Sequence, residues 1–522
     1  MAHNFRPWTH DQLYLLPPAL NDWVDDDHVI HFVADVVREI DISAIEATYL
    51  DKDPRGTVPY HPRMLLALLI YSYSRGVTSS RKIERATWED VATRVLVGDQ
   101  HPDHSRIAEF RRRHADSFRQ VFAEVLRLCS RAGLVKIGRV ALDGTKLQAD
   151  ASKHKAMSYG RMKQTEKRLE REIAALLAEA EATDRAEDRQ YGQDRGGDEL
   201  PEELRRRATR LARIRQAKAE LEAAAAAGRA EQLERRAEGR EAELLKDDDR
   251  EDDDREDDEP PKTVRKLSRQ ERRRLERLAK KSRREADNAR RKAQDRSEKS
   301  TRGLLPQACD ATDLVLHRPR FDRYGDPTET SQWNFTDPDS RIAKMGNGSF
   351  AQAYNAQAVV TDGQLIAATD VSNAPPDSQQ LPPMLAQTAE NCGALPDVAV
   401  VDNGYFSQAN VDWCDAHGVD AYISVGRKRW KDVPPEAGRA RAAVVNMHSK
   451  LTTDVGREHY RRRKMIVEPV FGQIKEAMGF RRFRLRGLRK VRGEWNLVTT
   501  AHNILKAYRS GYRVAGLSLA PA

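Results

Sequence analysis

The feature that most constrains this chain is a long, highly charged block, residues 158–300, which separates two β-rich apolar segments. Within it, residues 166–182 and 204–227 place leucine and isoleucine at helical spacing, and residues 264–292 are strongly basic. An acidic near-repeat predicts a disordered linker near 246–262. We therefore expect a long helical hairpin or coiled-coil insertion within a folded core.

The apolar segments on either side of this block predict short strands, and those after it alternate with helices. The expected strands cover residues 136–143, 354–360, 365–370, 398–401 and 421–425. Strands followed by alternating helix and strand indicate an α/β core with a mixed sheet and flanking helices.

The first 134 residues predict only helices. Their turn-separated helices carry Arg81, Lys82 and the run 111–113, which fits a DNA-reading helix-turn-helix or a bundle for packing and dimerisation. The expected divisions along the chain are 1–134 (helical domain for DNA binding or dimerisation), 135–157 (first part of the α/β core), 158–300 (insertion), 301–510 (remainder of the α/β core) and 511–522 (tail).

Charge and cysteine content narrow the class of protein. Lys and Arg total 90 against 81 Asp and Glu, a net charge of +9, which fits either a polyanionic partner or a solvated charged surface. The four cysteines form no Cys-x-x-Cys pair, which argues against a disulfide framework and a structural zinc site. The longest apolar stretch, residues 64–70, is too short to span a bilayer. We expect a cytoplasmic protein without a membrane partner.

Two Asp-containing motifs share one design. Asp143-Gly144 and Asp402-Asn403-Gly404 each follow an apolar strand, and a following glycine lets the backbone leave the sheet. A carboxylate at the edge of a buried strand is costly unless it is paired or bound to a cation. The alternative for each motif is an ordinary turn, because Asp-Gly is a common turn pair.

A third acid, Glu468, lies in a segment with an apolar helical face. Glu468 and Lys475 are two helical turns apart, and Arg461 and Lys464 precede them on nearly the same side. Such a helix can present one acid with flanking cations to a phosphate, or it can be a surface helix with ion pairs. Three carboxylates from separate elements can hold two Mg²⁺ or Mn²⁺ ions about 4 Å apart, which suits phosphodiester hydrolysis and transfer.

These motifs together resemble the DDE transposases of bacterial insertion sequences, in the branch with a Tyr-Arg-Glu-Lys signature. The resemblance covers nearly the whole chain. It rests on Leu15-Leu16-Pro17-Pro18, Asp103-His104-Ser105, Asp143-Gly144-Thr145-Lys146, Tyr354-Asn355-Ala356-Gln357, Asp402 with Gly404-Tyr405, and the segment 467–475.

The resemblance implies an RNase H-like fold with Asp143, Asp402 and Glu468 as catalytic metal ligands. Tyr460, Arg463 and Lys475 are the implied signature residues near phosphate, although the usual arginine position, four before the acid, is Lys464 here. Which cation acts therefore stays open. The cluster that follows, Arg481, Arg482 and Arg484 among others, favours DNA contact, and the interleaved Phe480 and Phe483 fit core packing better than base stacking.

We therefore expect a homo-oligomeric enzyme that binds double-stranded DNA, both terminal inverted repeats and target, cleaves the strands and joins a 3′ hydroxyl to the target. The alternatives are a related nuclease without strand transfer and a catalytically inactive, transposase-derived DNA-binding protein.

Overall fold

The computed structural model describes residues 19–49, 58–191, 202–253, 267–298, 318–374, 376–426 and 438–512. Two compact units emerge from them. Unit 1 comprises residues 1–150, 311–315 and 343–522, and unit 2 comprises residues 151–310 and 316–342. Among the described helices, none combines the length and the apolar composition that a bilayer crossing requires.

A mixed sheet forms the centre of unit 1, with the order β4-β5-β1-β7-β8 and β6 paired to β5. β1, β5 and β6 are antiparallel, whereas β7 and β8 continue the sheet in parallel with β1. The expected α/β core is therefore present. Its strands are β1 (Arg139–Gln148), β4 (Arg341–Lys344), β5 (Phe350–Thr361), β6 (Ile366–Ser372), β7 (Val398–Val401) and β8 (Asp420–Ile423).

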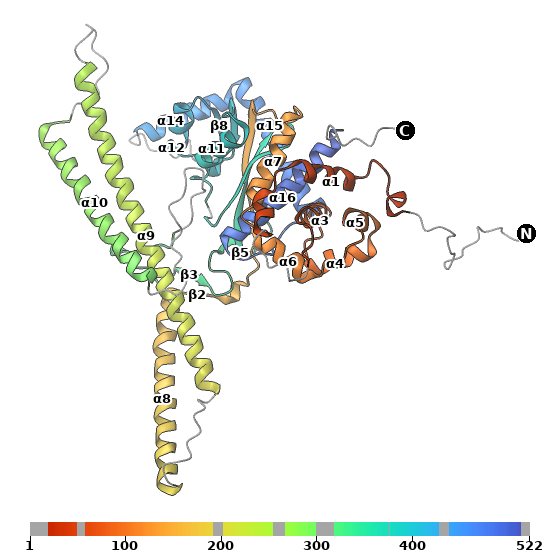
Figure 1. Cartoon of the computed structure of the whole chain (residues 1–522). Helices are drawn as coiled ribbons and strands as arrows, with labels where there is room; N and C mark the ends of the chain where they lie inside the picture. The colour runs from red at the N-terminus through yellow and green to blue at the C-terminus, as the bar shows by residue number, and fades with distance from the viewer. Residues whose placement is uncertain are drawn as a thin grey trace, which may run out of the picture. The chain divides into compact units, whose positions relative to one another are not determined.

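Helices cover this sheet and continue into the N-terminal part of unit 1 (Figure 1). After the strands come α11 (Leu381–Cys392), α12 (Gln408–Ala416), α14 (Gly438–Thr452), α15 (Asp454–Gly472) and α16 (Leu488–Arg509). Before them come α1 (Val29–Glu39), α2 (Ser43–Glu46), α3 (Pro62–Ser74), α4 (Ser80–Glu89), α5 (Val91–Leu96), α6 (His104–Arg113) and α7 (Phe118–Arg131).

The almost fully buried helix α16 joins the sheet to these N-terminal helices. It packs against β6 on one side and against α3 and α7 on the other. The indole nitrogen of Trp495 donates a hydrogen bond to the backbone oxygen of Gln357 on β5 at 3.1 Å. The N-terminal helices and the sheet therefore share one core.

Unit 2 is built on long helices, α8 (Tyr159–Tyr191), α9 (Glu202–Asp253) and α10 (Arg269–Glu298), with a small sheet of β2 (Ala156–Ser158) and β3 (Gln332–Asn334). Figure 1 shows α9 and α10 side by side as the arms of a hairpin. Part of the segment expected to be disordered, residues 246–253, is helical instead, because extending an existing helix costs little once it has nucleated. The rest of that expected linker lies outside the described residues.

The hairpin is held by small side chains and cross-helix ion pairs. α10 buries Ala279, Ser282, Ala286, Ala289 and Ala293, which recur at alternating steps of three and four residues. The guanidinium of Arg240 on α9 donates to the hydroxyl of Ser282 at 2.7 Å, and Arg290 pairs with Glu234 further along. These two contacts indicate antiparallel helices, because the residue number rises on α10, from 282 to 290, while it falls on α9, from 240 to 234.

Candidate active site

Asp143 and Asp402 lie beside one another on neighbouring strands. β1 and β7 are parallel, with Leu142 opposite Val401, so the next residue of each strand is the acid. Asp402 follows the last residue of β7, as expected, and caps a short 3-10 turn by accepting a hydrogen bond from the backbone nitrogen of Gly404 at 2.8 Å. The strand pairing therefore brings the two Asp motifs together.

The expectation that β1 ends at Asp143 is wrong, because the strand continues to Gln148. β5 is long enough to pair with this whole extension, from Asp143 opposite Ala358 to Gln148 opposite Ala353. Gly144 is therefore not a turn residue. A Cβ atom there would stand 2.7 Å from Asp377 Oδ1 and 2.9 Å from Asn355 Oδ1, so glycine makes room for neighbouring side chains.

One buried guanidinium serves both carboxylates. Arg463 Nη2 lies 2.7 Å from Asp143 Oδ2 and 4.0 Å from Asp402 Oδ2, and the Arg463 side chain is only 9% exposed. Burial raises the pKa of Asp143 to about 6, and the neighbouring Asp402 carboxylate adds to this shift while Arg463 opposes it. The two carboxylates therefore repel each other in a partly desolvated site. The guanidinium of Arg463 offsets part of this repulsion.

A further carboxylate, Asp377, belongs to the same cluster and was not predicted. Its Oδ1 accepts hydrogen bonds from the side-chain amides of Asn355 and Gln357 on β5, each at 2.7 Å. The buried hydroxyl of Tyr405 donates to the amide oxygen of Gln357, which fixes the orientation of that amide. Burial raises the pKa of Asp377, and the carboxylate of Asp402 adds to the shift.

The sequence indicates only part of this hydrogen-bond network around Asp377. The Tyr354-Asn355-Ala356-Gln357 motif was identified as a strand, and Asn355 and Gln357 do project from one face of β5 by strand alternation. Their acceptor, however, lies in the loop between β6 and α11, where the sequence has no strand or helix pattern. Predicting Asp377 from the sequence would require knowing that the loop between β6 and α11 returns to this face of β5.

Glu468 does not join the two Asp residues. It is exposed on α15, whereas the buried positions of this helix include Arg463, Val467 and Val470. In the described ranges, no group of three His, Cys, Asp or Glu side chains is placed to hold a metal ion. Pro469 lies inside α15, and residues Gln473–Ala477 form a π turn directly after it, so the helix is irregular next to Glu468.

The side chains predicted to contact phosphate occupy different environments. Tyr460 is half-buried on α15, and Lys464 is exposed. Lys475 is half-buried in the π turn, where burial lowers its pKa while the Asp143 carboxylate raises it. Lys475 therefore lies within electrostatic range of Asp143.

The basic cluster after α15 is exposed and already bonded to neighbouring groups. Arg481 pairs with Glu476, Arg482 pairs with Asp150 at 2.8 Å, and Arg484 Nε donates to Thr78 Oγ1 at 3.2 Å. Exposed pairs of this kind contribute about 0–1 kcal/mol and are readily exchanged for a phosphate. Phe480 and Phe483 are buried, which confirms the interpretation of these rings as core.

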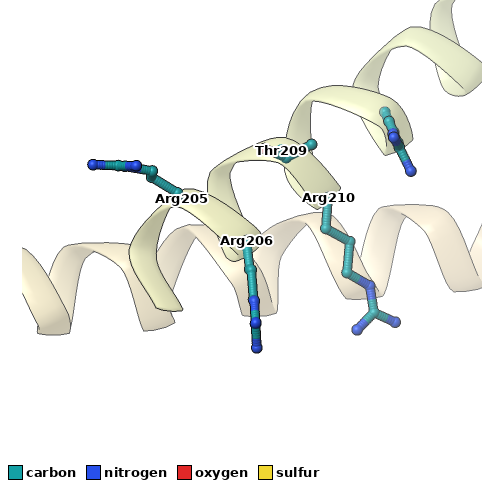
Figure 2. A pocket seen from close by; sticks show the side chains of 5 residues that line it. Arg205, Arg206, Thr209 and Arg210 are labelled. Atoms are coloured by element: carbon teal, nitrogen blue, oxygen red, sulfur yellow. The ribbon is translucent and has the colours of Figure 1, made fainter. Parts of the chain in front are cut away.

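A second charged feature lies within unit 2. A shallow hollow on α9 is lined by Arg205, Arg206, Thr209, Arg210 and Arg213, and Figure 2 shows the labelled arginines pointing away from the helix axis. The lining carries four arginines and no acid, so the hollow is positively charged.

Two family models match the chain. One, described as a transposase DDE domain, matches residues 304–504, and the other, described as a transposase domain (DUF772), matches residues 18–113. Asp402 and Glu468 fall within the first match, whereas Asp143 lies between the two. No curated protein and no solved structure matches the chain.

Proposed function

Because the chain belongs to the DDE transposases of insertion sequences, we propose that it cleaves and transfers DNA strands at the terminal inverted repeats of its own element. The observation that carries this proposal is the geometry of Asp143 and Asp402. They follow paired positions of two parallel strands, and a single nitrogen of Arg463 lies within 4.0 Å of both.

The residues present fit the divalent ions that such an enzyme uses. Carboxylate oxygens are the ligands that Mg²⁺ and Mn²⁺ prefer, and a cation relieves the repulsion between two partly buried acids. The position of Arg463 Nη2, within 4.0 Å of both carboxylates, supports a shared place for positive charge. When bound, one ion would activate the attacking oxygen and the other would stabilise the leaving 3′ oxygen. We propose Asp143, Asp402 and Glu468 as their ligands.

Glu468 completes this proposed set only after a local rearrangement. The helix next to it departs from regular geometry at Pro469 and in the π turn that follows, so its turns can shift at lower cost than those of a straight helix. Arg463 would then be released from the carboxylates to contact the scissile phosphate, together with Lys475 and with Tyr460 and Lys464 on the same helix as Arg463. The exposed Arg481, Arg482 and Arg484 would bind the flanking backbone.

The arrangement of the elements supports the finer fold assignments. The strand order β6-β5-β1-β7-β8, antiparallel and then parallel, supports an RNase H-like catalytic core. The alternating spacing of small buried residues on α10 supports a coiled coil for the α9–α10 hairpin. We propose a homo-oligomer, because two element ends must be held together for joining. We also propose residue 134 as the end of the DNA-binding or dimerisation segment, which packs on the same core as the catalytic segment.

The test is strand cleavage of a duplex that carries the terminal repeat, in Mg²⁺, by Asp143→Asn, Asp402→Asn and Glu468→Gln. Each variant should lose cleavage and keep DNA binding. Joining of pre-cut ends separates a transposase from a nuclease, which would cut but not join. If the unmodified protein binds the ends and neither cuts nor joins them, the chain is a DNA-binding protein without catalysis and the proposal fails.

A further inference from the structure

We infer that the outer face of α10 is a docking surface for the backbone of duplex DNA, separate from the carboxylate cluster. The identity of this ligand rests on the proposed function. The surface, called here the α10 row, consists of Arg273, Arg277, Lys280, Arg284 and Arg291, all of which are exposed. Their steps of four, three, four and seven residues keep them on one helical face over about 27 Å, at a rise of 1.5 Å per residue.

The neighbouring cations of α10 are used differently. Arg283 forms a bidentate ion pair with Glu241 of α9, and Arg290 pairs with Glu234. Lys292 and Arg296 share Asp326. Cations on the flanks of α10 are thus neutralised by acids of their own unit.

The α10 row makes no ion pair with any acid that the structure describes. The opposite face of α10, with Ala286 at its centre, packs against α9, so the row is not needed for the fold. Like charges three or four residues apart destabilise a helix by a few tenths of a kcal/mol per pair. The first four cations of the row therefore repel one another in the free protein, and a polyanion offsets that cost.

Duplex DNA fits this row better than a small anion does. The row is about 27 Å long at a rise of 1.5 Å per residue, and duplex DNA presents one phosphate charge about every 1.7 Å of its axis, so several cations can be neutralised at once. Four of its five cations are arginines, whose planar guanidinium groups bind phosphate oxygens in pairs. A single nucleotide or inorganic phosphate would engage only one or two of them.

The experiment compares two multiple variants of the full chain, each in an Asp143→Asn background so that binding is measured without cleavage. In the row variant, Arg273, Arg277, Lys280, Arg284 and Arg291 are changed to Gln. In the control, the paired Arg283 and Arg290 are changed to Gln. We measure the affinity for a 40-base-pair duplex (about 136 Å at 3.4 Å per pair) as a function of salt, and helix content by circular dichroism.

The row variant should reduce the magnitude of the negative slope of log affinity against log salt by about 4.5, since each of the five lost phosphate contacts removes roughly 0.9. The control should change it by less than about 1. An unchanged slope with unchanged helix content overturns the inference. So does a loss of binding to phosphatidylglycerol vesicles without a loss of binding to DNA. Because cleavage plays no part in the readout, a protein that never cuts DNA refutes the proposed function and leaves this test intact.

We infer separately that Asp377 is a positioning residue for the cation site formed by Asp143 and Asp402, and that it acts on a bound ion through water. Its Oδ1 is occupied by two amide donors, whereas its Oδ2 accepts no hydrogen bond from the described residues. Oδ2 lies 3.4 Å from the place where a Cβ of Gly404 would stand, and Oδ1 lies 2.7 Å from that of Gly144. The glycines of both Asp motifs thus leave space for this one carboxylate.

The two amide hydrogen bonds to Oδ1 fix the orientation of Asp377 and leave its Oδ2 available as an acceptor. Mg²⁺ and Mn²⁺ keep several bound waters, so a carboxylate beyond direct reach acts through a water molecule. Asp377 is therefore a positioning residue that increases the cation affinity of the Asp143–Asp402 pair.

Titration of Mn²⁺ into the full-length protein tests this role. Asp377→Asn can still accept from Asn355 and Gln357 but should bind Mn²⁺ roughly tenfold more weakly, the usual effect of losing an outer-shell partner. Asp377→Glu should recover part of the affinity. The matched control is Asp150→Asn, which removes a carboxylate paired with Arg482 and Arg486, and should leave Mn²⁺ affinity unchanged. Wild-type Mn²⁺ affinity in Asp377→Asn overturns the assignment, whereas wild-type affinity in Asp143→Asn overturns the site itself.

Discussion

The carboxylate cluster of unit 1 and the α10 row of unit 2 place charge in opposite settings. In the cluster, acids are partly buried, and Asp143 shares Arg463 with Asp402. In the row, cations of one sign stand in water without acidic partners among the described residues. Removing one partner of a buried pair costs about 3–5 kcal/mol, whereas exposed pairs contribute about 0–1 kcal/mol. Mutations in the cluster should therefore lower stability by several kcal/mol, whereas mutations in the row should change stability by about 1 kcal/mol or less and act mainly on binding.

The largest effect is expected where a buried counter-charge is removed. Arg463→Gln leaves Asp143 and Asp402 close together without their shared cation, and should lower the free energy of unfolding by about 3 kcal/mol in the absence of metal. Added Mn²⁺ should restore part of this loss, because it replaces the missing charge. Urea denaturation with and without Mn²⁺ measures both effects. A loss below about 0.5 kcal/mol would remove the distinction between the two regions.

The next effect depends on pH and involves another buried group of unit 1, the imidazole of His502. Burial lowers the pKa of His502 to about 4, and its Nε2 lies 3.0 Å from the backbone oxygen of Gln364. The unfolded chain, with an ordinary pKa of 6.5, binds a proton that the folded chain rejects. The stabilisation is therefore complete above pH 6.5 and decreases by about 3 kcal/mol as the pH falls towards 4.

His502→Asn retains an amide donor for Gln364 and has no ring to protonate. The pH dependence of its unfolding free energy should be flatter than that of the wild type between pH 6.5 and 4. Denaturation curves at several pH values give this difference directly. Parallel wild-type and variant profiles would contradict a neutral, buried imidazole.

A smaller effect tests the hydrogen-bond network behind the carboxylates. Tyr405→Phe removes the hydroxyl that donates to Gln357 and leaves a buried amide oxygen without that donor. The expected loss is about 1–2 kcal/mol of unfolding free energy, together with weaker Mn²⁺ binding because Asp377 loses its fixed amide partner. Unchanged Mn²⁺ affinity would show that the network supports the fold alone.

The smallest effect is expected in unit 2. Arg290→Gln breaks the pair with Glu234, in which the arginine side chain is 60% exposed. The unfolding free energy should change by less than about 1 kcal/mol, and the salt dependence of DNA binding should stay at the wild-type value. A loss of several kcal/mol here would show that surface charges of the hairpin hold its fold, against the comparison above.

How far the sequence predicts this molecule depends on whether a feature is local. β7 and Asp402 could be predicted because an apolar run of four residues ends directly in an acid. The true end of β1 could not, because pairing with β5, far away in sequence, keeps Gly144 within the sheet. The helix that carries Glu468 was predicted, but tertiary packing selects Arg463 as its inward residue. Asp377 was missed because three separate segments create its environment.

The most direct test of the central claim is a crystal structure of the full chain bound to Mn²⁺ and a terminal-repeat duplex, with anomalous scattering recorded at the manganese edge. The account predicts anomalous density between the carboxylates of Asp143 and Asp402, Arg463 displaced towards phosphate, and Glu468 turned inward to the ions. Manganese density elsewhere, with Arg463 still joining the two acids and Glu468 in solvent, would contradict it.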